Sequence, residues 1–338
     1  MSPPASVYTN VASEYQAATE QSAVHNTSSV GRLKASGDDA LDLLNRLSTN
    51  RVAGLEPGQG APTILTTDRG RILDLIGVVN IGDYVLLLTS PEQQQAVIDW
   101  LDKYTIMEDL TVEDMTSQTA MLTVLGPNSG SKLEEVLGVN LHQLPPYHTI
   151  PASVGGQTLN VINRPLGTLP GFDLIAHSND IDGVWHCLVD SGVAPIGTQA
   201  YEAVRLQHAV PLYGHEMGDA YNPLEAGLIG SIDFHKGCYI GQEVIARLDT
   251  YQKVQKRLVR LRFSPDAKVF QDAALEDDGQ QVGKVTSVTS LPITGERIGL
   301  GYVRTGSLEV GAHLQLAAPA AGWAEIEDLS QLFGPGEG

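Results

Sequence analysis

Hydrophobic and polar residues follow a helical period in the first part of the chain. In residues 35–50, leucines recur at the spacing of one helix face, at positions Leu41, Leu44 and Leu47. Ser36 or Asp38 stands before them, where a side chain can cap the first turn. This stretch therefore predicts a short amphipathic helix.

Strand and helix patterns alternate further along the chain. Two β-rich runs within residues 61–80 flank Asp68-Arg69-Gly70, which predicts a hairpin. Residues 84–90 predict a buried strand, and residues 91–104 predict a helix with a proline near its first turn. The order of strand, polar turn and amphipathic helix returns in residues 172–192. We interpret this recurrence as an internal duplication of a split α+β motif.

After Val254 the pattern changes to short strands separated by Gly, Asp and Pro. This is typical of a small all-β domain, and we expect a barrel. The predicted fold class is thus α+β with a C-terminal β-barrel. We expect five parts along the chain. Residues 1–25 form an N-terminal extension, flexible or helical, and residues 26–115 form an α+β domain that parts of 150–250 could complete. Residues 116–253 form a central α+β domain, residues 254–333 form the barrel, and residues 334–338 form a loose tail.

Composition limits the kind of protein. The chain has 338 residues and no apolar run near the ~20 that a membrane span needs. The first 26 residues have no Lys or Arg and no apolar core, so we expect no targeting signal and a cytoplasmic protein. Cys187 and Cys238 are the only cysteines, which fits a reducing compartment. Two cysteines cannot alone hold zinc or an iron–sulfur cluster, and the histidine spacings match no compact metal site.

The formal net charge is −19, which argues against nonspecific binding of nucleic acid. A solvated acidic surface and an adaptation to high salt both explain this charge. One strip runs against it, with basic residues at Lys236, Arg247, Lys253, Lys256, Arg257, Arg260 and Arg262. Such a strip indicates a small anionic ligand, although ordinary alternation along a surface strand explains it too.

The stretch KGCYIGQEVIAR, residues 236–247, carries the strongest candidate chemistry. Gly237 and Gly241 predict a tight turn around Cys238, and a helix is compatible with the sequence from Gln242. A helix N-terminus and a nearby Lys236 both favour the thiolate form of the cysteine. A reactive or ligand-contacting thiol and a buried structural cysteine both remain open.

Two further features of this stretch carry charge. Glu243 and Arg247 stand four residues apart in the order that favours a helical ion pair. Lys236 either neutralises an anionic ligand or is one more surface lysine.

The same stretch resembles the signature of YgfZ-type folate-binding proteins, which are relatives of the glycine cleavage T-protein. The matching residues are Lys236, Gly237, Cys238, Tyr239, Gly241, Gln242, Glu243 and Arg247. AYEAVRLQHAVPLYGHEM, YNPLEAGL, RGRILDL and GKVTSVT with IGLGYVR are similar to other parts of the T-protein superfamily. The resemblance covers nearly the whole chain after about residue 25.

The resemblance implies a three-domain cloverleaf around a central channel that holds tetrahydrofolate. It implies an accessory factor for iron–sulfur cluster assembly or repair, with partners among the assembly machinery or client enzymes such as those that thiolate tRNA. The alternative is a tetrahydrofolate-dependent aminomethyltransferase or demethylase. The catalytic candidates are Cys238, Lys236 and Asp74. The candidates for cofactor binding are Lys236, Tyr239, Gln242, Glu243, Arg247, Glu202, Arg205 and Gln207.

Three departures from the T-protein pattern bear on this choice. Asp74 stands alone where the enzymes carry two adjacent aspartates, and its alternative role is a strand-end carboxylate. Gln207 replaces a glutamate that grips the pterin amino group, for which Glu202 is a possible substitute. Cys238 has no counterpart in T-proteins, and it favours the accessory factor. A third possibility is a binding scaffold without folate.

Overall fold

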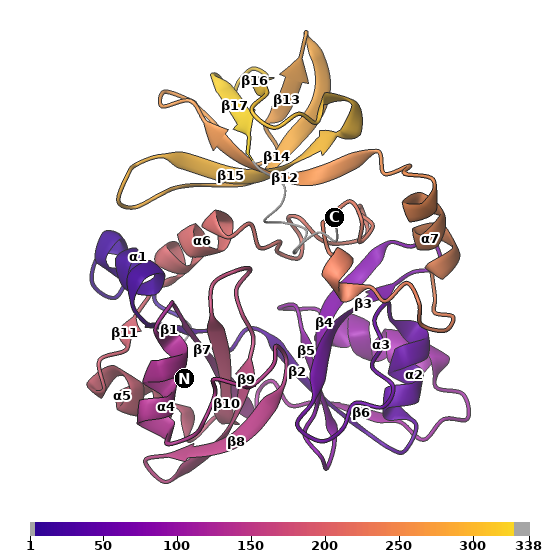
Figure 1. Ribbon diagram of the computed structural model, residues 1–338, viewed down its shortest axis with the longest axis vertical. Coiled ribbons are helices and arrows are strands. Elements are labelled where there is room, and N and C mark those ends of the chain that lie inside the picture. The colour runs from indigo at the N-terminus through magenta and orange to yellow at the C-terminus, as the bar shows by residue number, and fades with distance from the viewer. Residues whose placement is uncertain (1–3, 328–338) are drawn as a thin grey trace. The chain divides into compact units, whose positions relative to one another are not determined.

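The computed structural model describes residues 4–327, which form two compact units (Figure 1). Unit 1 contains the residues up to Thr66 together with Leu73–Tyr201 and Ser231–Ile240. Unit 2 contains Thr67–Ile72, Glu202–Gly230 and the chain from Gly241 onward. The predicted tail at 334–338 lies outside the described residues. No helix among residues 4–327 is long and apolar enough to cross a membrane.

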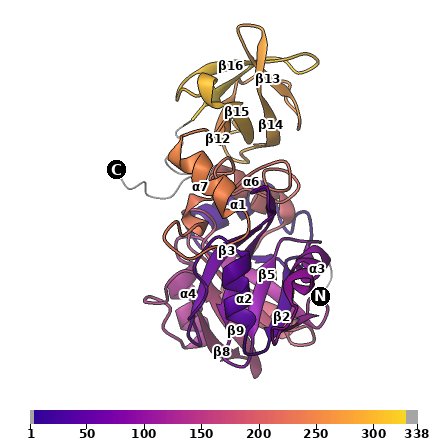
Figure 2. The ribbon, with the colours of Figure 1, turned by 90° about the vertical axis from the view of Figure 1, so that its right-hand side faces the viewer.

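Unit 1 contains a five-stranded sheet with strand order β3-β4-β5-β2-β6. Its strands are β2 (Gly31–Ser36), β3 (Gly60–Thr66), β4 (Ile72–Asn80), β5 (Val85–Thr89) and β6 (Thr111–Asp114). Helices α2 (Ala40–Leu47) and α3 (Gln94–Tyr104) pack on one face of it, where α2 is seen in front of the sheet in Figure 2. The hairpin predicted around Asp68-Arg69-Gly70 is confirmed, because β3 and β4 flank it.

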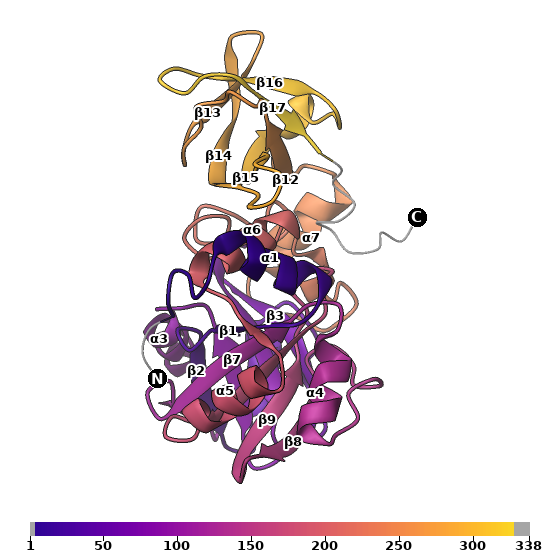
Figure 3. The ribbon, with the colours of Figure 1, turned by 90° about the vertical axis from the view of Figure 1, so that its left-hand side faces the viewer.

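A six-stranded sheet with order β11-β1-β7-β10-β9-β8 forms the rest of unit 1. Its strands are β1 (Ala23–Asn26), β7 (Thr119–Leu125), β8 (Thr149–Val154), β9 (Gln157–Asn163), β10 (Gly171–His177) and β11 (Ala194–Pro195). Helices α4 (Ser129–Leu137) and α5 (Ile181–Asp190) cover one face (Figure 3). Helix α1 (Val11–Glu20) precedes β1.

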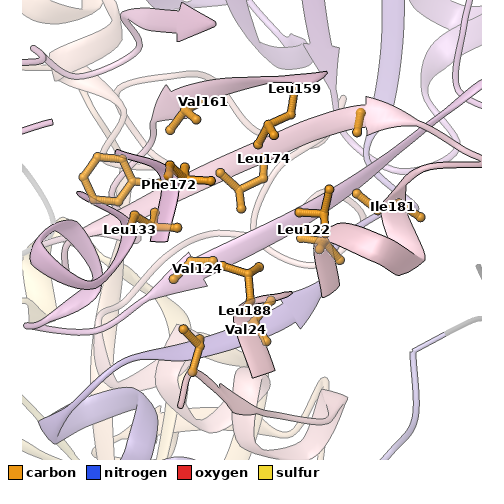
Figure 4. Close-up of a cluster of buried hydrophobic side chains, with 14 of the residues drawn as sticks. Val24, Leu122, Val124, Leu133, Leu159, Val161, Phe172, Leu174, Ile181 and Leu188 are labelled. Carbon is orange, nitrogen blue, oxygen red and sulfur yellow. The ribbon is translucent and has the colours of Figure 1, made fainter. Parts of the chain in front are cut away.

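Alternation along β7 shows how the layers pack. Leu122 and Val124 join Leu133 of α4 and Leu188 of α5 in the core between sheet and helices (Figure 4). Met121, on the opposite face of the strand, packs with buried residues of β4, β5, β9 and β10 in a second cluster between the two sheets. Unit 1 is therefore a four-layer arrangement of helices, sheet, sheet and helices.

The predicted internal duplication is confirmed. The elements β2-α2-β3-β4-β5-α3 repeat in the same order as β7-α4-β8-β9-β10-α5. The strand orders β3-β4-β5-β2 and β8-β9-β10-β7 correspond within their sheets. Each half thus has its own hydrophobic core between its sheet and its helices, and the two halves share the cluster between the sheets.

Unit 2 contains a closed barrel of order β12-β15-β14-β13-β16-β17, which confirms the predicted C-terminal barrel. Its strands are β12 (Lys256–Phe263), β13 (Ala274–Asp277), β14 (Gln280–Ser290), β15 (Arg297–Arg304), β16 (His313–Leu316) and β17 (Trp323–Ile326). Helix α6 (Thr198–Gln207) begins in unit 1 and ends in unit 2, and α7 (Gln242–Thr250) precedes the barrel. Two short 3-10 turns, Ile229–Ser231 and Thr305–Ser307, complete the list.

The first predicted helix needs a correction. The stretch 35–50 contains α2, but its first two residues belong to β2. Asp39 is the N-cap, not Ser36 or Asp38, and its side chain makes no capping bond. Its carboxylate instead accepts the backbone N–H of Asp109 at 2.8 Å, so a tertiary contact replaces the local cap.

Candidate active site

Asp74 of β4 is the first of the predicted site residues, and it is fully buried in unit 1. Its Oδ2 accepts the backbone N–H of Ser90, just after β5, at 2.9 Å. Its Oδ1 is buried and has no hydrogen-bond partner among the described residues. Burial raises the pKa of Asp74 to about 6, although the side chain of Ser90 and the backbone N–H groups of Ser90 and Leu75 work in the opposite direction. A carboxyl group with a pKa near neutrality and one open oxygen is equipped to take a proton from a ligand.

Lys236 is buried, so it is not one more surface lysine, and its ammonium group makes three hydrogen bonds within the protein. Nζ donates to the carbonyl oxygens of Asn45, Ser48 and Asn50 at 2.6, 2.7 and 2.6 Å. These carbonyls lie at and beyond the C-terminal end of α2, where a helix leaves acceptors without partners. Burial lowers the pKa of Lys236 to about 8, so the amine keeps its proton at neutral pH. A ligand could reach this ammonium only by displacing one of the three carbonyls.

The segment around Lys236 is anchored at both ends. Asp233 pairs with Arg51 at 3.0 Å, and the hydroxyl of Thr66 donates to the carbonyl oxygen of Ile240 at 2.6 Å. Ile240 also packs against the core under α2. Between these anchors, Cys238 is exposed. The alternative of a buried structural cysteine is therefore wrong.

Of the remaining residues of the motif, Tyr239 belongs to unit 1 and is buried. Its ring lies 5.4 Å from Nζ of Lys236, and burial raises its pKa to about 12. Gln242, Glu243 and Arg247 lie on α7 in unit 2. The helix begins at Gln242, as predicted, after Gly241 with φ of +85°, a left-handed conformation that favours glycine. Glu243 and Arg247 are both exposed, and in the described part of the chain they make no ion pair with each other.

Arg205 of α6 is buried in unit 2 and holds a network together. Its Nε and Nη2 donate to the carboxylate of Glu202 at 2.8 and 2.6 Å. Its Nη1 donates to Glu216 at 3.1 Å and to the carbonyl oxygen of Val210 at 2.6 Å, and Nη2 also donates to Ser287 at 3.1 Å. All five N–H groups of the guanidinium are engaged. Arg205 and Glu202 thus have their charges satisfied inside the protein.

Gln207 ends α6 and is half-buried, and its backbone carbonyl accepts from Arg260 at 2.8 Å. The basic strip is also partly neutralised, because Arg260 pairs with Glu327 at 2.6 Å and Arg262 with Glu325 at 2.7 Å. Within residues 4–327, no three His, Cys, Asp or Glu side chains gather closely enough to hold a metal ion.

Two site residues were missed at the level of sequence. Ser90 supplies the N–H that holds Asp74, but a backbone donor carries no signature in its side chain. Glu216 is completely buried between Arg205 and Ser287. The acidic residue after the LYG stretch was a visible signal for Glu216, since a charged residue beside apolar neighbours marks a buried pair.

The comparisons with known proteins agree with this architecture. Residues 3–236 match the family described as the GCVT N-terminal domain, and residues 256–325 match the glycine cleavage T-protein C-terminal barrel domain. A crystal structure of the glycine cleavage system aminomethyltransferase T from Bartonella henselae is similar in fold, with a TM-score of 0.83 and 19% identity. It covers 96% of this chain and 90% of its own.

Two relatives are similar to this chain in sequence. A chloroplastic protein of Arabidopsis thaliana named as a transferase is 32% identical over 324 residues, which is 92% of this chain and 72% of the relative. An aminomethyltransferase of Halothermothrix orenii is 28% identical over 302 residues, which is 88% of this chain and 84% of the relative. The chain belongs to the glycine cleavage T-protein family.

Proposed function

We propose that the protein transfers a one-carbon unit between an amine and reduced folate, as an enzyme of the aminomethyltransferase type. The observation that carries this proposal is the unpartnered Oδ1 of Asp74 in a fully buried position. An unsatisfied buried carboxylate oxygen costs stability, and proteins keep such groups where a ligand completes them. The relatives named as aminomethyltransferases support the proposal.

An amine fits the open oxygen of Asp74. A protonated or secondary amine donates an N–H to Oδ1, while Ser90 keeps Oδ2 in place. With its pKa raised to about 6, the carboxylate accepts the amine proton more readily than an ordinary aspartate at neutral pH. Tetrahydrofolate, when bound, would supply the nitrogen that forms the new bond to the one-carbon unit, while the bond between that carbon and the donor amine breaks and the amine leaves.

Lys236 and Arg205 act as positioning residues in this proposal. Each has all its donors engaged by protein acceptors, so neither is free to contact the cofactor without breaking a bond. Lys236 fixes the end of α2 and the segment that follows it, whereas Arg205 fixes α6. The remaining candidates for cofactor contact are Tyr239, Gln242, Glu243, Arg247 and Gln207.

The test is turnover by the full chain with tetrahydrofolate and isotopically labelled glycine-derived or dimethylglycine-like amines. We expect Asp74→Asn to lower the turnover rate about 10²- to 10⁴-fold, the range for losing a general acid or base. Asp83→Asn is the matched control, because Asp83 is exposed in the loop before β5 of the same sheet. Equal rates for Asp74→Asn and the natural protein would refute the assignment. Calorimetric titration with tetrahydrofolate checks binding separately from turnover.

A second candidate function, support of iron–sulfur enzymes, is favoured by Cys238. Its thiol is exposed on a segment held at Lys236, Asp233 and Ile240, so it is available to a partner. A thiolate can contribute one ligand to a cluster whose other ligands belong to that partner. We expect Cys238→Ala to fail in restoring iron–sulfur enzyme activity to a deletion strain, while Cys187→Ala restores it. Full rescue by Cys238→Ala would exclude a role of this thiol.

A further inference from the structure

We infer that the barrel of unit 2 carries a binding site for a compact anion, a carboxylate or phosphate group, at Lys256 and Arg304. The site is a pocket with a volume of about 250 Å³. Its lining includes Tyr221, Gln281, Lys284 and Tyr302. This inference does not depend on the proposed transferase activity.

Strand register brings the two cations together. Lys256 begins β12 and lies directly opposite Arg304, which ends β15. Like charges directly opposite each other on antiparallel strands are unfavourable. Such a local conflict indicates a functional position when nothing nearby resolves it.

A third cation lies on the same face of the sheet. Lys284 of β14 is opposite Tyr302 of β15, and Tyr302 is two residues from Arg304. Because side chains two apart on a strand share a face, Lys256, Lys284, Tyr302 and Arg304 all project to the same side of the barrel wall. The other side of this wall is the barrel core, which contains Val303.

Two stacked aromatic rings hold Lys256 in the pocket. The ring centroids of Tyr221 and Tyr302 are 4.1 Å apart with an interplanar angle of 9°. Nζ of Lys256 lies 4.4 Å from the first centroid and 5.2 Å from the second. The Tyr302 hydroxyl is turned away to donate to the carbonyl oxygen of Glu216 at 2.7 Å. The rings therefore position the ammonium group without neutralising its charge.

The nearby carboxylates of Asp272 and Glu225 pair with other cations. Lys284 pairs with Asp272 at 2.8 Å, and Arg71 lies 3.6 Å from Glu225. Among the described residues, neither Lys256 nor Arg304 makes an ion pair or a side-chain hydrogen bond. Burial lowers the pKa of Lys256, although the charge of the Glu225 carboxylate works in the opposite direction. Arg304 is exposed, and Lys256 is held by the rings rather than by an ion pair. On a chain of net charge −19, two such cations in one pocket favour the binding of an anion.

The size of the pocket limits the ligand. A cavity of about 250 Å³ is smaller than the typical ~300–1,000 Å³ of a site for a drug-sized molecule. It suits one phosphate, a small dicarboxylate or the acidic end of a longer molecule. Two cations from adjacent strands offer donors to more than one oxygen of such a group.

The experiment uses the full chain, with inorganic phosphate in one arm and citrate in the other. Each is titrated calorimetrically against the natural protein, Lys256→Gln, Arg304→Gln and the control Lys268→Gln. Lys268 is exposed elsewhere in unit 2, so its replacement removes one charge without touching the pocket. We expect saturable binding that weakens about tenfold or more in Lys256→Gln and Arg304→Gln, and is unchanged in Lys268→Gln.

Lysine acylation followed by mass spectrometry supplies a readout that needs no variant. The bound anion should protect Lys256 from acylation and leave Lys268 as reactive as before. The arm that protects, phosphate or citrate, distinguishes the two sources of negative charge. Absence of saturable binding in both arms, or equal protection of the two lysines, would overturn the inference.

Discussion

Each half of unit 1 contains one completely buried aspartate, Asp74 on β4 and Asp173 on β10, and the two have different surroundings. Asp173 of β10 forms an ion pair with Arg164, and its other oxygen accepts the hydroxyl of Thr123 at 2.6 Å. Asp74 of β4 accepts the backbone N–H of Ser90 at Oδ2, has no cation beside it, and has no hydrogen-bond partner at Oδ1 among the described residues. The duplicated architecture thus uses one carboxylate to hold its own fold together and leaves the other incompletely satisfied.

The comparison teaches that burial alone does not identify a reactive carboxylate. A buried carboxylate that is paired with a cation and hydrogen-bonded is tolerated in its ionised form. Burial of a carboxylate without a cation raises its pKa. Asp74 shows the second behaviour, since burial raises its pKa to about 6. The predictions below test whether the two aspartates differ in this way.

The largest effect on stability is expected at Asp173. Asp173→Asn leaves the Arg164 guanidinium without its countercharge in a largely enclosed position, and breaking such a pair costs about 3 kcal/mol of unfolding free energy. Urea denaturation of the variant and the natural protein measures the loss. A change below about 0.5 kcal/mol, the range of a surface substitution, would show that Asp173 is not a structural carboxylate.

Lys236 is the next in size. Lys236→Met removes the donor shared by three carbonyl oxygens at the end of α2, and buried acceptors left unpaired cost about 2 to 3 kcal/mol in total. Lys253→Met is the control, since Lys253 is exposed and its replacement should change stability little. If both variants unfold at the same urea concentration as the natural protein, Lys236 is not a structural clamp, and its role as a ligand contact becomes the better explanation.

Asp74→Asn should change stability in the direction opposite to Asp173→Asn. At pH 7 the natural carboxylate is ionised without a countercharge, so the neutral amide should raise the unfolding free energy by about 1 to 2 kcal/mol. The gain falls short of the full electrostatic penalty because the amide N–H₂ finds no acceptor. Thermal and urea unfolding at pH 7 measure it. A destabilised variant would show that Asp74 resembles Asp173 after all.

The smallest effect on stability is expected at Cys238. Because its side chain is exposed, Cys238→Ala should change the unfolding free energy by less than about 0.5 kcal/mol. In the folded protein, iodoacetamide should label Cys238 faster than the half-buried Cys187. Faster labelling of Cys187 would contradict the exposure of the motif.

Much of the fold was predictable because alternation and turn residues act locally. The short strands predicted after Val254 are present as β12 to β17, and Val259, Leu261 and Phe263 alternate along β12 with their side chains in the barrel core. Leu258, on the other face, is also buried, and its backbone N–H donates to the carbonyl oxygen of Glu225 at 2.9 Å. Strands such as β6, whose residues TVED are mostly exposed, gave no signal in the hydrophobic pattern.

The candidate site was less predictable, because its properties come from distant contacts. Lys236 was recognised as a site residue by family resemblance, but the three carbonyls that occupy it are 186 to 191 residues away in sequence. The stretch RGRILDL identified Asp74, but it could not show that Asp74 lacks a cation, which distinguishes it from Asp173. Lys256 and Arg304 lie on separate strands, and only the strand register of the barrel shows that they are opposite each other.

The most direct test of the account is the pH dependence of unfolding for the natural protein and Asp74→Asn. A folded pKa of about 6, above the ordinary 3.8, means that the folded state binds the Asp74 proton more tightly than the unfolded state does. Asp74 therefore contributes stability below about pH 4, and this contribution is lost as pH rises to 6. The account predicts that the natural protein loses about 2 to 3 kcal/mol relative to Asp74→Asn between pH 4 and pH 7. Curves that stay parallel across this range would contradict it.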